Sequence, residues 1–396
     1  MPEIEVYVPG VHGVHGKTDS SMHTVNQQLI ADRLKISRAT VSRCFTNHPG
    51  INPKTRARVF SLASRLGYTP LEKRAESGSR SEKRGLNFGV LICVELPNFE
   101  HTAYGNPGQE LLNGLSDFAR GQDVRLDLHF VRPEDLHLDS PSYAASMGQR
   151  RSKWNGVVLI YPFPRTVVDE LVDRYPVVSL VEQYGGTAIN CVDVDHHRGV
   201  ARLIDRLRSV GHERIGFFTW RYQVEATWSL RRFGAYVEQL TALGIPLRET
   251  DMINVGPHGA MPIEESYERL LAQTRAGVTA WICAADHQAY EVIQWLEGRG
   301  VHVPRDVSVT GFDGLAQPAG APLLSTVQVP FHEIGVNGGK RLLDLVHKRF
   351  GAPQHILLDC GLREGSTIAP PVRCAAAPPR APGMREVGQR TDEVGS

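Results

Sequence analysis

The segment from Ser37 to Arg43 reads Ser-Arg-Ala-Thr-Val-Ser-Arg, and it constrains the fold more than any other part of the chain. Ser37 is a good N-cap for a helix that follows it. Helical spacing divides the side chains of this segment into two sets. The inward-facing set is apolar: Val41, Cys44 and Phe45. The outward-facing set is polar or small: Arg38, Ala39, Ser42 and Arg43.

A helix is expected on each side of this segment. Residues 27–34 carry apolar side chains along one face, and Lys35-Ile36 makes a turn. A third helix begins at Asn52-Pro53, a cap followed by proline at the first helical position, and stops at Gly67. This pattern is typical of a helix-turn-helix, whose second helix enters the DNA major groove. The alternative is a three-helix unit that merely has a basic face, but the caps, the turn and the charge together favour DNA binding.

The positive charge of the chain is concentrated in the same region. Residues 24–84 hold 13 Lys and Arg against four Asp and Glu, whereas the whole chain of 396 residues has a net charge of +1. A basic head on a more acidic body indicates a nucleic-acid-binding module joined to a domain with another task. The length is sufficient for two or three units with their own cores.

Several classes of protein are excluded by composition. The six cysteines are scattered without a Cys-x-x-Cys pair, so we expect no zinc site, no disulfide framework and no cofactor. No basic segment followed by an apolar run marks a secretory signal, and no stretch approaches the roughly 18 apolar residues of a membrane span. The sequence therefore predicts a cytoplasmic protein without membrane contact.

From residue 86 onward, strands and amphipathic helices alternate, which is the pattern of parallel sheets covered by helices. Residues 86–369 form a longer segment than one ordinary sheet and its helices require. We therefore expect an α/β body of two lobes behind a small all-α helix-turn-helix head. Strands are expected at 88–94, 126–131, 157–161, 177–181, 215–219, 280–284 and 307–311. Helices are expected at 110–119, 167–174, 199–210, 232–243, 263–274, 289–298 and 334–350.

Composition divides the chain into five parts: a flexible extension at 1–23, the helix-turn-helix domain at 24–70, a charged linker at 71–85, the body at 86–369 and a disordered Pro/Ala/Arg-rich tail at 370–396. His12 and His15 in the extension are candidate metal ligands. A mobile tail without metal is the preferred interpretation.

Ligands of open parallel sheets bind beyond the carboxyl ends of the strands. Aromatic faces stack on flat or apolar ligand surfaces, while Asp and Arg hydrogen-bond to hydroxyl groups. We therefore expect a small polar metabolite between two closing lobes. For individual residues, a purely structural role is the alternative to ligand binding: packing for Trp220, an ion pair for Arg231 and a helix cap for Asp313. The segments that the rule selects are 95–109, 161–165, 182–184, 220–231, 286–287 and 313–314.

From Asn26 to Ile368 the sequence resembles the LacI family of transcriptional regulators. Matching motifs in the head are Ser37–Arg43, His48–Ile51, Lys54–Arg56 and Leu66–Pro70. Matching motifs in the body are Val192–Asp195, Gly211–Gly216, Val303-Pro304, Gly311–Asp313 and Leu323–Val327. Their order and spacing carry the resemblance. It implies a homodimer, a body resembling type I periplasmic binding proteins, and a near-palindromic double-stranded DNA operator.

The resemblance also assigns roles in DNA binding. An arginine in the second helix most often takes the O6 and N7 atoms of guanine, and this contact specifies sequence. Contacts with phosphates set the register instead. The residues implied to meet base edges are Arg38, Ala39 and Arg43. The residues implied to hold phosphates are Ser37, Thr40, Ser42, Asn52 and Thr55.

In the body, the resemblance implies a site for a sugar or sugar derivative. An arginine three residues before a glycine binds the effector in the family, and Arg231 with Gly234 fits that pattern. Ala285 stands where the family usually has Asn, directly before Asp286, so the hydrogen bonds to the effector are expected to differ. The full set of expected effector-binding residues is Tyr161, Trp220, Arg231, Asp286 and Asp313.

The hinge after the head departs from the family pattern. Members usually continue after Tyr-x-Pro with Asn, then Ala three residues on, then a Leu that wedges into the minor groove and kinks the DNA. Leu71, Arg74 and Ser77 stand at these positions. We therefore expect this protein to lack the leucine wedge and to bend its operator less.

The leading functional prediction is a DNA-binding regulator that responds to a small effector. A regulator whose body only dimerises is the main alternative. A transport-type binding protein fits poorly with the helix-turn-helix. An enzyme is disfavoured because the chain lacks a Gly-x-Ser-x-Gly elbow, a phosphate-binding Gly-x-x-x-x-Gly-Lys-Ser/Thr loop and a His-Glu-x-x-His motif.

Overall fold

The computed structural model describes residues 27–45, 51–65, 85–94, 105–147, 154–222, 224, 226–255, 261–347 and 352–371. The chain divides into two compact units with a boundary between Ser79 and Arg80, and each unit is described by itself. The extension at 1–23, the hinge positions 71, 74 and 77, and the tail from residue 372 onward lie outside the described residues.

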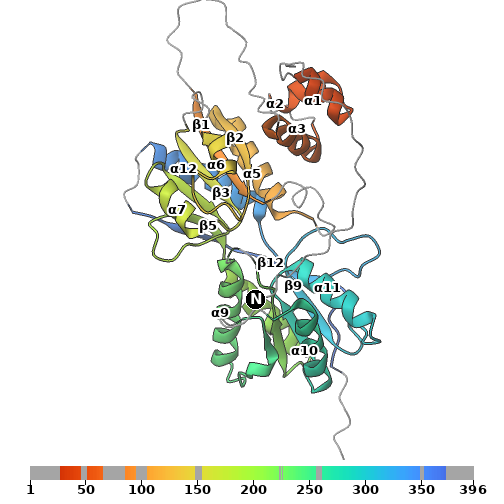
Figure 1. Cartoon of the computed structure of the whole chain (residues 1–396). Coiled ribbons are helices and arrows are strands. Elements are labelled where there is room, and N and C mark those ends of the chain that lie inside the picture. The colour runs from red at the N-terminus through yellow and green to blue at the C-terminus, as the bar shows by residue number, and fades with distance from the viewer. Residues whose placement is uncertain are drawn as a thin grey trace, which may run out of the picture. The chain divides into compact units, whose positions relative to one another are not determined.

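The head consists of three short helices: α1 (Gln27–Leu34), α2 (Arg38–Phe45) and α3 (Pro53–Arg65) (Figure 1). The turn between α1 and α2 is tight because Lys35 adopts a left-handed backbone conformation with φ of 53°. The small core formed by the three helices comprises Ile30, Ala31, Val41, Cys44, Val59, Leu62 and Ala63. The side chain of Phe45, which was expected to face inward, lies outside the described residues.

The body contains two six-stranded sheets with the same strand order. The sheet of the amino-terminal lobe runs β11-β5-β4-β3-β1-β2, and that of the carboxy-terminal lobe runs β12-β10-β9-β8-β6-β7. Leaving out β11 and β12, each sheet has the doubly wound order 2-1-3-4-5. The first lobe contains β1 (Leu86–Cys93), β2 (Val124–Val131), β3 (Gly156–Ile160), β4 (Val177–Leu180), β5 (Asn190–Val194) and β11 (His355–Leu358). The second contains β6 (Ile215–Phe218), β7 (Met252–Ile253), β8 (Ala280–Cys283), β9 (Ser308–Asp313), β10 (Ser325–Gln328) and β12 (Gly361–Arg363).

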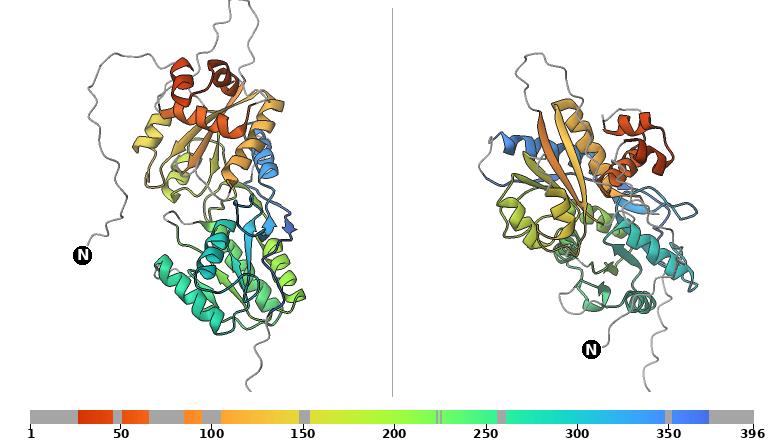
Figure 2. Two further views of the ribbon diagram at one scale, coloured as in Figure 1. Left: turned by 90° about the vertical axis from the view of Figure 1, so that its right-hand side faces the viewer. Right: turned by 45° about the horizontal axis from the view of Figure 1, so that its top comes forward.

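Helices cover both faces of each sheet, as two directions of view show (Figure 2). In the amino-terminal lobe, α12 packs against α5 and contacts β3, β4 and β5. In the carboxy-terminal lobe, α8 packs against α9 and contacts β10 and β12. The helices of the body are α5 (Pro107–Gln122), α6 (Pro141–Met147), α7 (Arg165–Val172), α8 (His196–Ser209), α9 (Thr227–Ala242), α10 (Ile263–Arg275), α11 (Asp286–Glu297) and α12 (Phe331–Val346), with a 3-10 turn at Glu249–Asp251.

The chain passes between the two lobes three times. It crosses from β5 to α8, returns from β10 to α12, and crosses again from β11 to β12. β11 pairs in parallel with β5, whereas β12 pairs antiparallel with β10. Each lobe is therefore completed by a strand from the carboxy-terminal part of the chain.

The central strands of both sheets are buried on their two faces, so most of them are nearly continuous runs of apolar residues. All residues of β3, β6 and β8 are buried. A tryptophan lies against a glycine in each lobe: Trp154 against Gly89 of β1, and Trp281 against Gly216 of β6. A side chain on either glycine would collide with the indole ring.

Helices α5 and α12 approach each other most closely at two glycines. A methyl group on Gly114 would collide with the carbonyl oxygen of His332, and one on Gly335 would collide with that of Leu111. We expect Gly114→Ala to lower the free energy of unfolding by about 1–3 kcal/mol, because the helices must separate. Urea unfolding of the full chain checks this. Gly234→Ala in α9 is the matched control: nothing lies within 4 Å of its added methyl group, and we expect it to stabilise by about 0.5–1 kcal/mol. A loss in both variants would contradict the packing argument.

The predicted fold class is confirmed: a three-helix head precedes an α/β body of two lobes. The strands predicted around residues 90, 128, 158, 178, 217, 282 and 309 are present. β5, β7, β10, β11, β12 and α6 were not predicted. α9 begins at Thr227, five residues before the expected start at Arg232.

Candidate functional site

The amino terminus of α2 is fixed by its own side chains. The Oγ atom of Ser37 accepts a hydrogen bond from the backbone N–H of Thr40 at 3.0 Å and lies 2.9 Å from Thr40 Oγ1. Arg38, Ala39 and Arg43 are exposed, whereas Thr40 and Ser42 are half-buried. The outer face of α2 thus presents two arginines around one small side chain.

The amino terminus of α3 is built in a similar way. The Oδ1 atom of Asn52 accepts a hydrogen bond from the backbone N–H of Lys54 at 2.8 Å. Asn52 is exposed and Thr55 is half-buried. Helix amino termini favour phosphate because their N–H groups and dipole point at the anion. The eight predicted DNA-binding residues therefore lie at the starts of two helices and along the outer face of one, and their contacts with DNA stay a prediction.

In the body, the central feature between the lobes is a buried ion pair. Arg232 of α9 lies 3.1 Å from Asp313 at the end of β9, and their side chains are 5% and 8% exposed. The guanidinium also donates to the carbonyl oxygens of Ala284 and Phe312. It lies 3.9 Å from the centre of the Phe312 ring and 4.7 Å from that of Trp228. Two aromatic rings, a carboxylate and two carbonyls thus hold Arg232 in place.

Arg232, rather than the predicted Arg231, forms this pair. The prediction of Arg231 relied on Gly234, three residues after it, as the glycine of the family pattern. The role of Arg231 toward an effector stays a prediction. Arg231 is half-buried, and its charge acts on Glu182.

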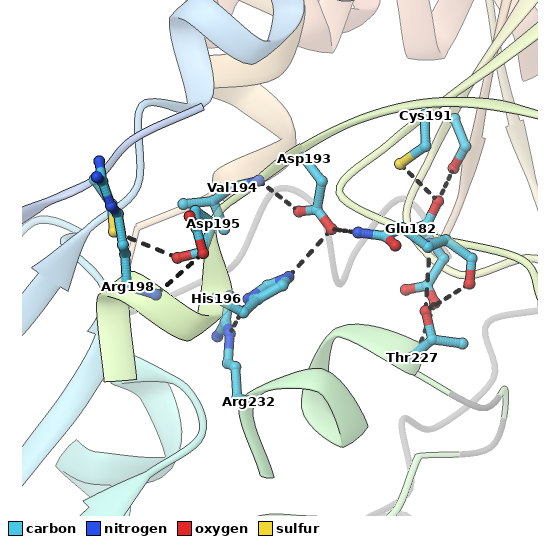
Figure 3. Close-up of polar contacts among 12 residues, drawn as sticks. Glu182, Cys191, Asp193, Val194, Asp195, His196, Arg198, Thr227 and Arg232 are labelled. Atoms are coloured by element: carbon cyan, nitrogen blue, oxygen red, sulfur yellow. Dashed lines mark hydrogen bonds and ion pairs between the residues drawn. The ribbon is translucent and has the colours of Figure 1, made fainter. Parts of the chain in front are cut away.

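A chain of polar contacts connects Arg232 to the first crossover between the lobes (Figure 3). The Nε atom of Arg232 donates to Nδ1 of His196 at 3.3 Å, and Nε2 of His196 lies 3.1 Å from Asp193. Burial lowers the pKa of His196, so the ring is uncharged and donates through Nε2. Asp193 also accepts from the side chain of Gln183 at 2.8 Å and from the N–H of Val194 at 2.7 Å. These contacts link Arg232 to the crossover from β5 to α8.

A second polar contact joins the two lobes directly. Glu182 follows β4 of the amino-terminal lobe, and its Oε1 atom accepts from the backbone N–H of Thr227 at 2.7 Å and from the Thr227 hydroxyl (Figure 3). Thr227 is the first residue of α9, whose N-cap Ala226 provides no side-chain hydrogen bond. The carboxylate of one lobe thus caps a helix of the other.

Burial raises the pKa of Glu182 to about 8. The carboxyl group ionises near 4.5 in the unfolded chain but stays protonated in the folded protein until about pH 8, so the free energy of unfolding falls as the pH rises through that interval. We expect Glu182→Gln to reduce this decrease in the free energy of unfolding by roughly 3–5 kcal/mol. Urea unfolding at pH 5, 6.5 and 8 measures it. Glu238→Gln, on the exposed side of α9, should keep the wild-type slope. Identical slopes in all three proteins would contradict the prediction.

Backbone strain is concentrated where β3 and β4 end. Tyr161 and Val181, the first residues after these strands, have φ values of 73° and 59°. A β-branched residue at positive φ is unusual, and such strain is often found at functional sites. The Tyr161 hydroxyl donates to Asn106 Oδ1 at 2.6 Å and accepts from the N–H of Gly108 at 3.1 Å. Tyr161 is thereby held at the amino terminus of α5.

Aromatic side chains gather at the end of β6. Trp220 packs edge-on against His287 with ring centres 4.9 Å apart. The Tyr222 hydroxyl lies 2.9 Å from Nε2 of His287 and accepts from Gln288 at 2.7 Å. Trp228, which lies against Arg232, has its ring centre 5.5 Å from that of Tyr222. These rings pack against one another at steep angles, and Trp228 brings the group next to the ion pair.

Asp286 differs from the other predicted residues because the protein itself uses both of its oxygens. Oδ1 accepts from the Thr326 hydroxyl, and Oδ2 accepts from the N–H of Leu315 at 2.8 Å. Its side chain is fully buried. In this geometry Asp286 holds β10 and the loop after β9 in position, and its contact with an effector stays a prediction.

The structure therefore brings four of the five predicted effector-binding residues into one region. The charge of Asp313 acts on Tyr161 from the other lobe, and Arg231 is one residue from Arg232. Trp220 reaches the same region through His287. Five residues of the site lie in segments that the sequence analysis selected but were not named individually: Glu182, Tyr222, Thr227, Trp228 and His287. Three lie outside those segments: Asp193, His196 and Arg232. Their signal was weaker, because Asp193 lies within β5 and Arg232 lies inside α9.

The described residues contain no group of three or more His, Cys, Asp or Glu side chains arranged to hold a metal ion. None of the helices that the structure describes is long and apolar enough to cross a membrane.

Two protein families match separate parts of the chain. Residues 28–70 match the family described as bacterial regulatory proteins, lacI family. Residues 204–368 match the family described as a periplasmic binding protein-like domain. The first match covers α1, α2 and α3, and the second includes the carboxy-terminal lobe from β6 to β12.

Known regulators are similar along most of the chain. Catabolite control protein A of Priestia megaterium is 25% identical over 328 residues, which cover 81% of this chain and 92% of the relative. The HTH-type transcriptional regulator AscG of Escherichia coli strain K12 is 27% identical over 354 residues, which cover 86% of this chain and 98% of the relative.

Solved structures share the fold. The lac repressor dimer bound to operator and the anti-inducer ONPF has a TM-score of 0.58 at 19% identity, and the match covers 88% of this chain and 100% of that one. The transcriptional regulator CelR in complex with cellobiose has a TM-score of 0.56 at 20% identity, and the match covers 87% and 100%.

Proposed function

This chain belongs to the LacI family of bacterial transcriptional regulators, and on that basis we propose that it binds a near-palindromic operator as a homodimer whose affinity is set by a small metabolite held between the lobes of the body. Its relatives regulate transcription and are not enzymes. The structural observation that carries the proposal is α2, a capped helix whose outer face presents Arg38, Ala39 and Arg43.

The head supports sequence-specific recognition of DNA because the residues suited to base contacts and those suited to phosphate contacts lie at separate positions. The arginines of α2 reach outward from the helix, as base contacts in the major groove require. The Ser37 and Asn52 caps lie at helix amino termini, where backbone phosphates bind favourably. A dimer related by twofold symmetry then requires two similar half-sites.

The body supports effector control because its two lobes meet through charged and aromatic groups. Arg232 and Asp313, with Tyr161, Trp220 and Arg231, make up the proposed effector site. A sugar or sugar derivative fits these residues, and the cellobiose complex of CelR, which has the same fold, supports this class. The effector changes operator affinity only if it binds one arrangement of the lobes better than another. The contacts from Arg232 to His196 and Asp193 give this change a path to the crossover.

Selection of random duplex DNA by the full-length protein tests the first part of the proposal. A palindromic motif is expected. The affinity for this motif should fall less steeply with rising salt than the affinity for unrelated DNA. Weak binding to all sequences, with a steep dependence on salt, would reject sequence-specific recognition.

A thermal-shift screen tests effector control, because a ligand that binds only the folded state raises the melting temperature. Hits are then added to the complex of protein and selected operator to measure the change in affinity. The direct hydrogen bonds between Glu182 and Thr227 favour a second candidate, in which the lobes are held together without a ligand and the body only dimerises. A complete absence of hits, together with intact operator binding, would support that candidate.

A further inference from the structure

The side chain of Glu182 reaches from the amino-terminal lobe to the carboxy-terminal lobe, and its own lobe holds its backbone in place. The carbonyl oxygen of Glu182 accepts hydrogen bonds from the Ser179 hydroxyl at 2.7 Å and from the Cys191 thiol at 3.2 Å. The preceding residue, Val181, has a left-handed backbone conformation with φ of 59°. The carboxyl group therefore projects from a fixed base toward Thr227 of the other lobe (Figure 3).

On the carboxy-terminal lobe, the first residue of α9 receives this contact. Oε1 of Glu182 accepts from the backbone N–H of Thr227 at 2.7 Å and from its hydroxyl. The hydroxyl oxygen of Thr227 accepts in turn from the N–H of Gln183 at 3.3 Å. Ala226, the N-cap of α9, makes no side-chain hydrogen bond. The side-chain cap of α9 therefore exists only while the two lobes are in contact, an arrangement that we call closed.

The surroundings of this carboxyl group suit its neutral form. Glu182 is completely buried, and its Oε2 atom has no hydrogen-bond partner among the described residues. Arg231 of α9 favours ionisation of the group, whereas Asp193 of β5 opposes it. Tyr184 and Cys191 are further titratable groups close to Glu182. Burial outweighs the effect of Arg231 and raises the pKa of Glu182 to about 8, so the group carries a proton at pH 7 in the closed arrangement.

Separating the lobes changes this environment. Water then reaches the carboxyl group, which ionises at its ordinary pKa of 4.5. A group that is protonated in one arrangement and ionised in the other couples the two arrangements to pH. Between these two pKa values, closing takes up one proton, so the ratio of closed to open molecules falls about tenfold for each unit of rising pH.

We propose that the lobes of the body close with the uptake of one proton by Glu182, so that acid favours the closed arrangement and alkali the open one. The inference goes beyond the proposed function, because this response needs no effector. Asp313 is a second buried carboxyl group, and burial raises its pKa to about 7. Its partner Arg232 belongs to the same lobe, so opening leaves that pair together. Glu182 is therefore the group that couples opening to pH.

Amide hydrogen exchange of the full-length protein without ligand tests the proposal at the contact itself. The N–H of Thr227 is bonded to Glu182 in the closed arrangement and exchanges when the lobes open. We expect its protection factor, corrected for the intrinsic effect of pH on exchange, to fall about tenfold per unit between pH 6 and 7.5. The buried amides of β8, at residues 280–283, report unfolding instead. Their protection should be at least about a hundredfold higher at every pH, because lobe opening leaves β8 intact.

Two substitutions distinguish Glu182 from other titrating groups. Glu182→Gln keeps an oxygen for Thr227 and resembles the neutral acid at every pH, so Thr227 should stay protected without dependence on pH. Glu182→Ala removes the cap, and the protection of Thr227 should be low at every pH. Glu238→Gln, which changes an exposed carboxylate of α9, should keep the wild-type slope.

Three results would overturn the proposal. They are a wild-type protection factor of Thr227 that does not change with pH, the same slope in Glu182→Gln as in the wild type, and equal protection of Thr227 and β8. Because no ligand is present, none of these results affects the proposed effector control.

Discussion

Replacing Arg232 by alanine is expected to lower the free energy of unfolding of the body by about 3–5 kcal/mol. The substitution leaves Asp313 buried without its cation, and it removes the donor to the carbonyl oxygens of Ala284 and Phe312. The loss is large because Asp313, whose pKa burial already raises to about 7, must then be buried as an unpaired charge or take up a proton. All five tryptophans lie in the body, at residues 154, 220, 228, 281 and 295. Urea unfolding followed by tryptophan fluorescence therefore measures this effect without interference from the head.

Two further variants separate the buried charge from a general effect of losing an arginine. Arg120 is 45% exposed and pairs with Asp117 on the surface of α5, so Arg120→Ala should cost less than about 1 kcal/mol. The double variant Arg232→Met/Asp313→Leu removes both charges and should recover most of the loss. A cost below about 1 kcal/mol for Arg232→Ala would show that the ion pair is not central to the body.

Replacing Arg38 by alanine is expected to relax operator specificity at one base pair in each half-site. The loss of discrimination should be about 1–3 kcal/mol per half-site, because a bidentate contact with guanine is the commonest role of an arginine in such a helix. The measurement is a repeated selection of random duplex DNA with the variant, followed by anisotropy titrations of the selected operator and of operators changed at single positions.

The control is Arg58→Ala, which removes the same charge from an exposed position on α3. We expect it to weaken binding to all sequences alike, if it contacts DNA, and to leave the selected motif unchanged. A uniform loss of affinity in Arg38→Ala, without a change in the motif, would reassign Arg38 to a phosphate contact.

The head was predictable from sequence because its determinants are local. The bounds of α1 agree with the expected 27–34, and the Ser37 and Asn52 caps form the expected kind of hydrogen bond within three residues of themselves. Caps, turns and helical periodicity act over one or two turns of chain. A single sequence therefore contains all the information that they need.

The strands of the body were predictable only where they are apolar. β5 was missed because Asn190 and Asp193 make residues 190–194 resemble a loop. In the structure, Arg341 of α12 donates to Asn190 at 2.9 Å, and Gln183 donates to Asp193. Arg341 lies 151 residues from Asn190, and Gln183 lies ten residues from Asp193 on the other side of a loop. Nothing within β5 itself therefore shows that its polar groups can be buried. The short edge strands β7, β11 and β12 lack a pattern for a related reason, since their neighbours define them.

Arg231 and Arg232 show how the register of a helix separates the roles of two neighbouring arginines. One residue corresponds to a rotation of about 100° around the helix axis. Arg232 is buried and pairs with Asp313, whereas Arg231 is half-buried, and its role toward an effector stays a prediction.

The three passages of the chain between the lobes have a consequence for how the protein is made. The core of the head lies entirely within residues 30–63. The amino-terminal lobe, in contrast, needs α12 and β11, which end at residues 346 and 358. Because domains fold as units while the ribosome is still adding residues, the head can fold long before the lobe that follows it. A premature stop codon anywhere from residue 70 to residue 354 therefore leaves a DNA-binding head attached to an unfinished body, without the part of the protein that is proposed to control it.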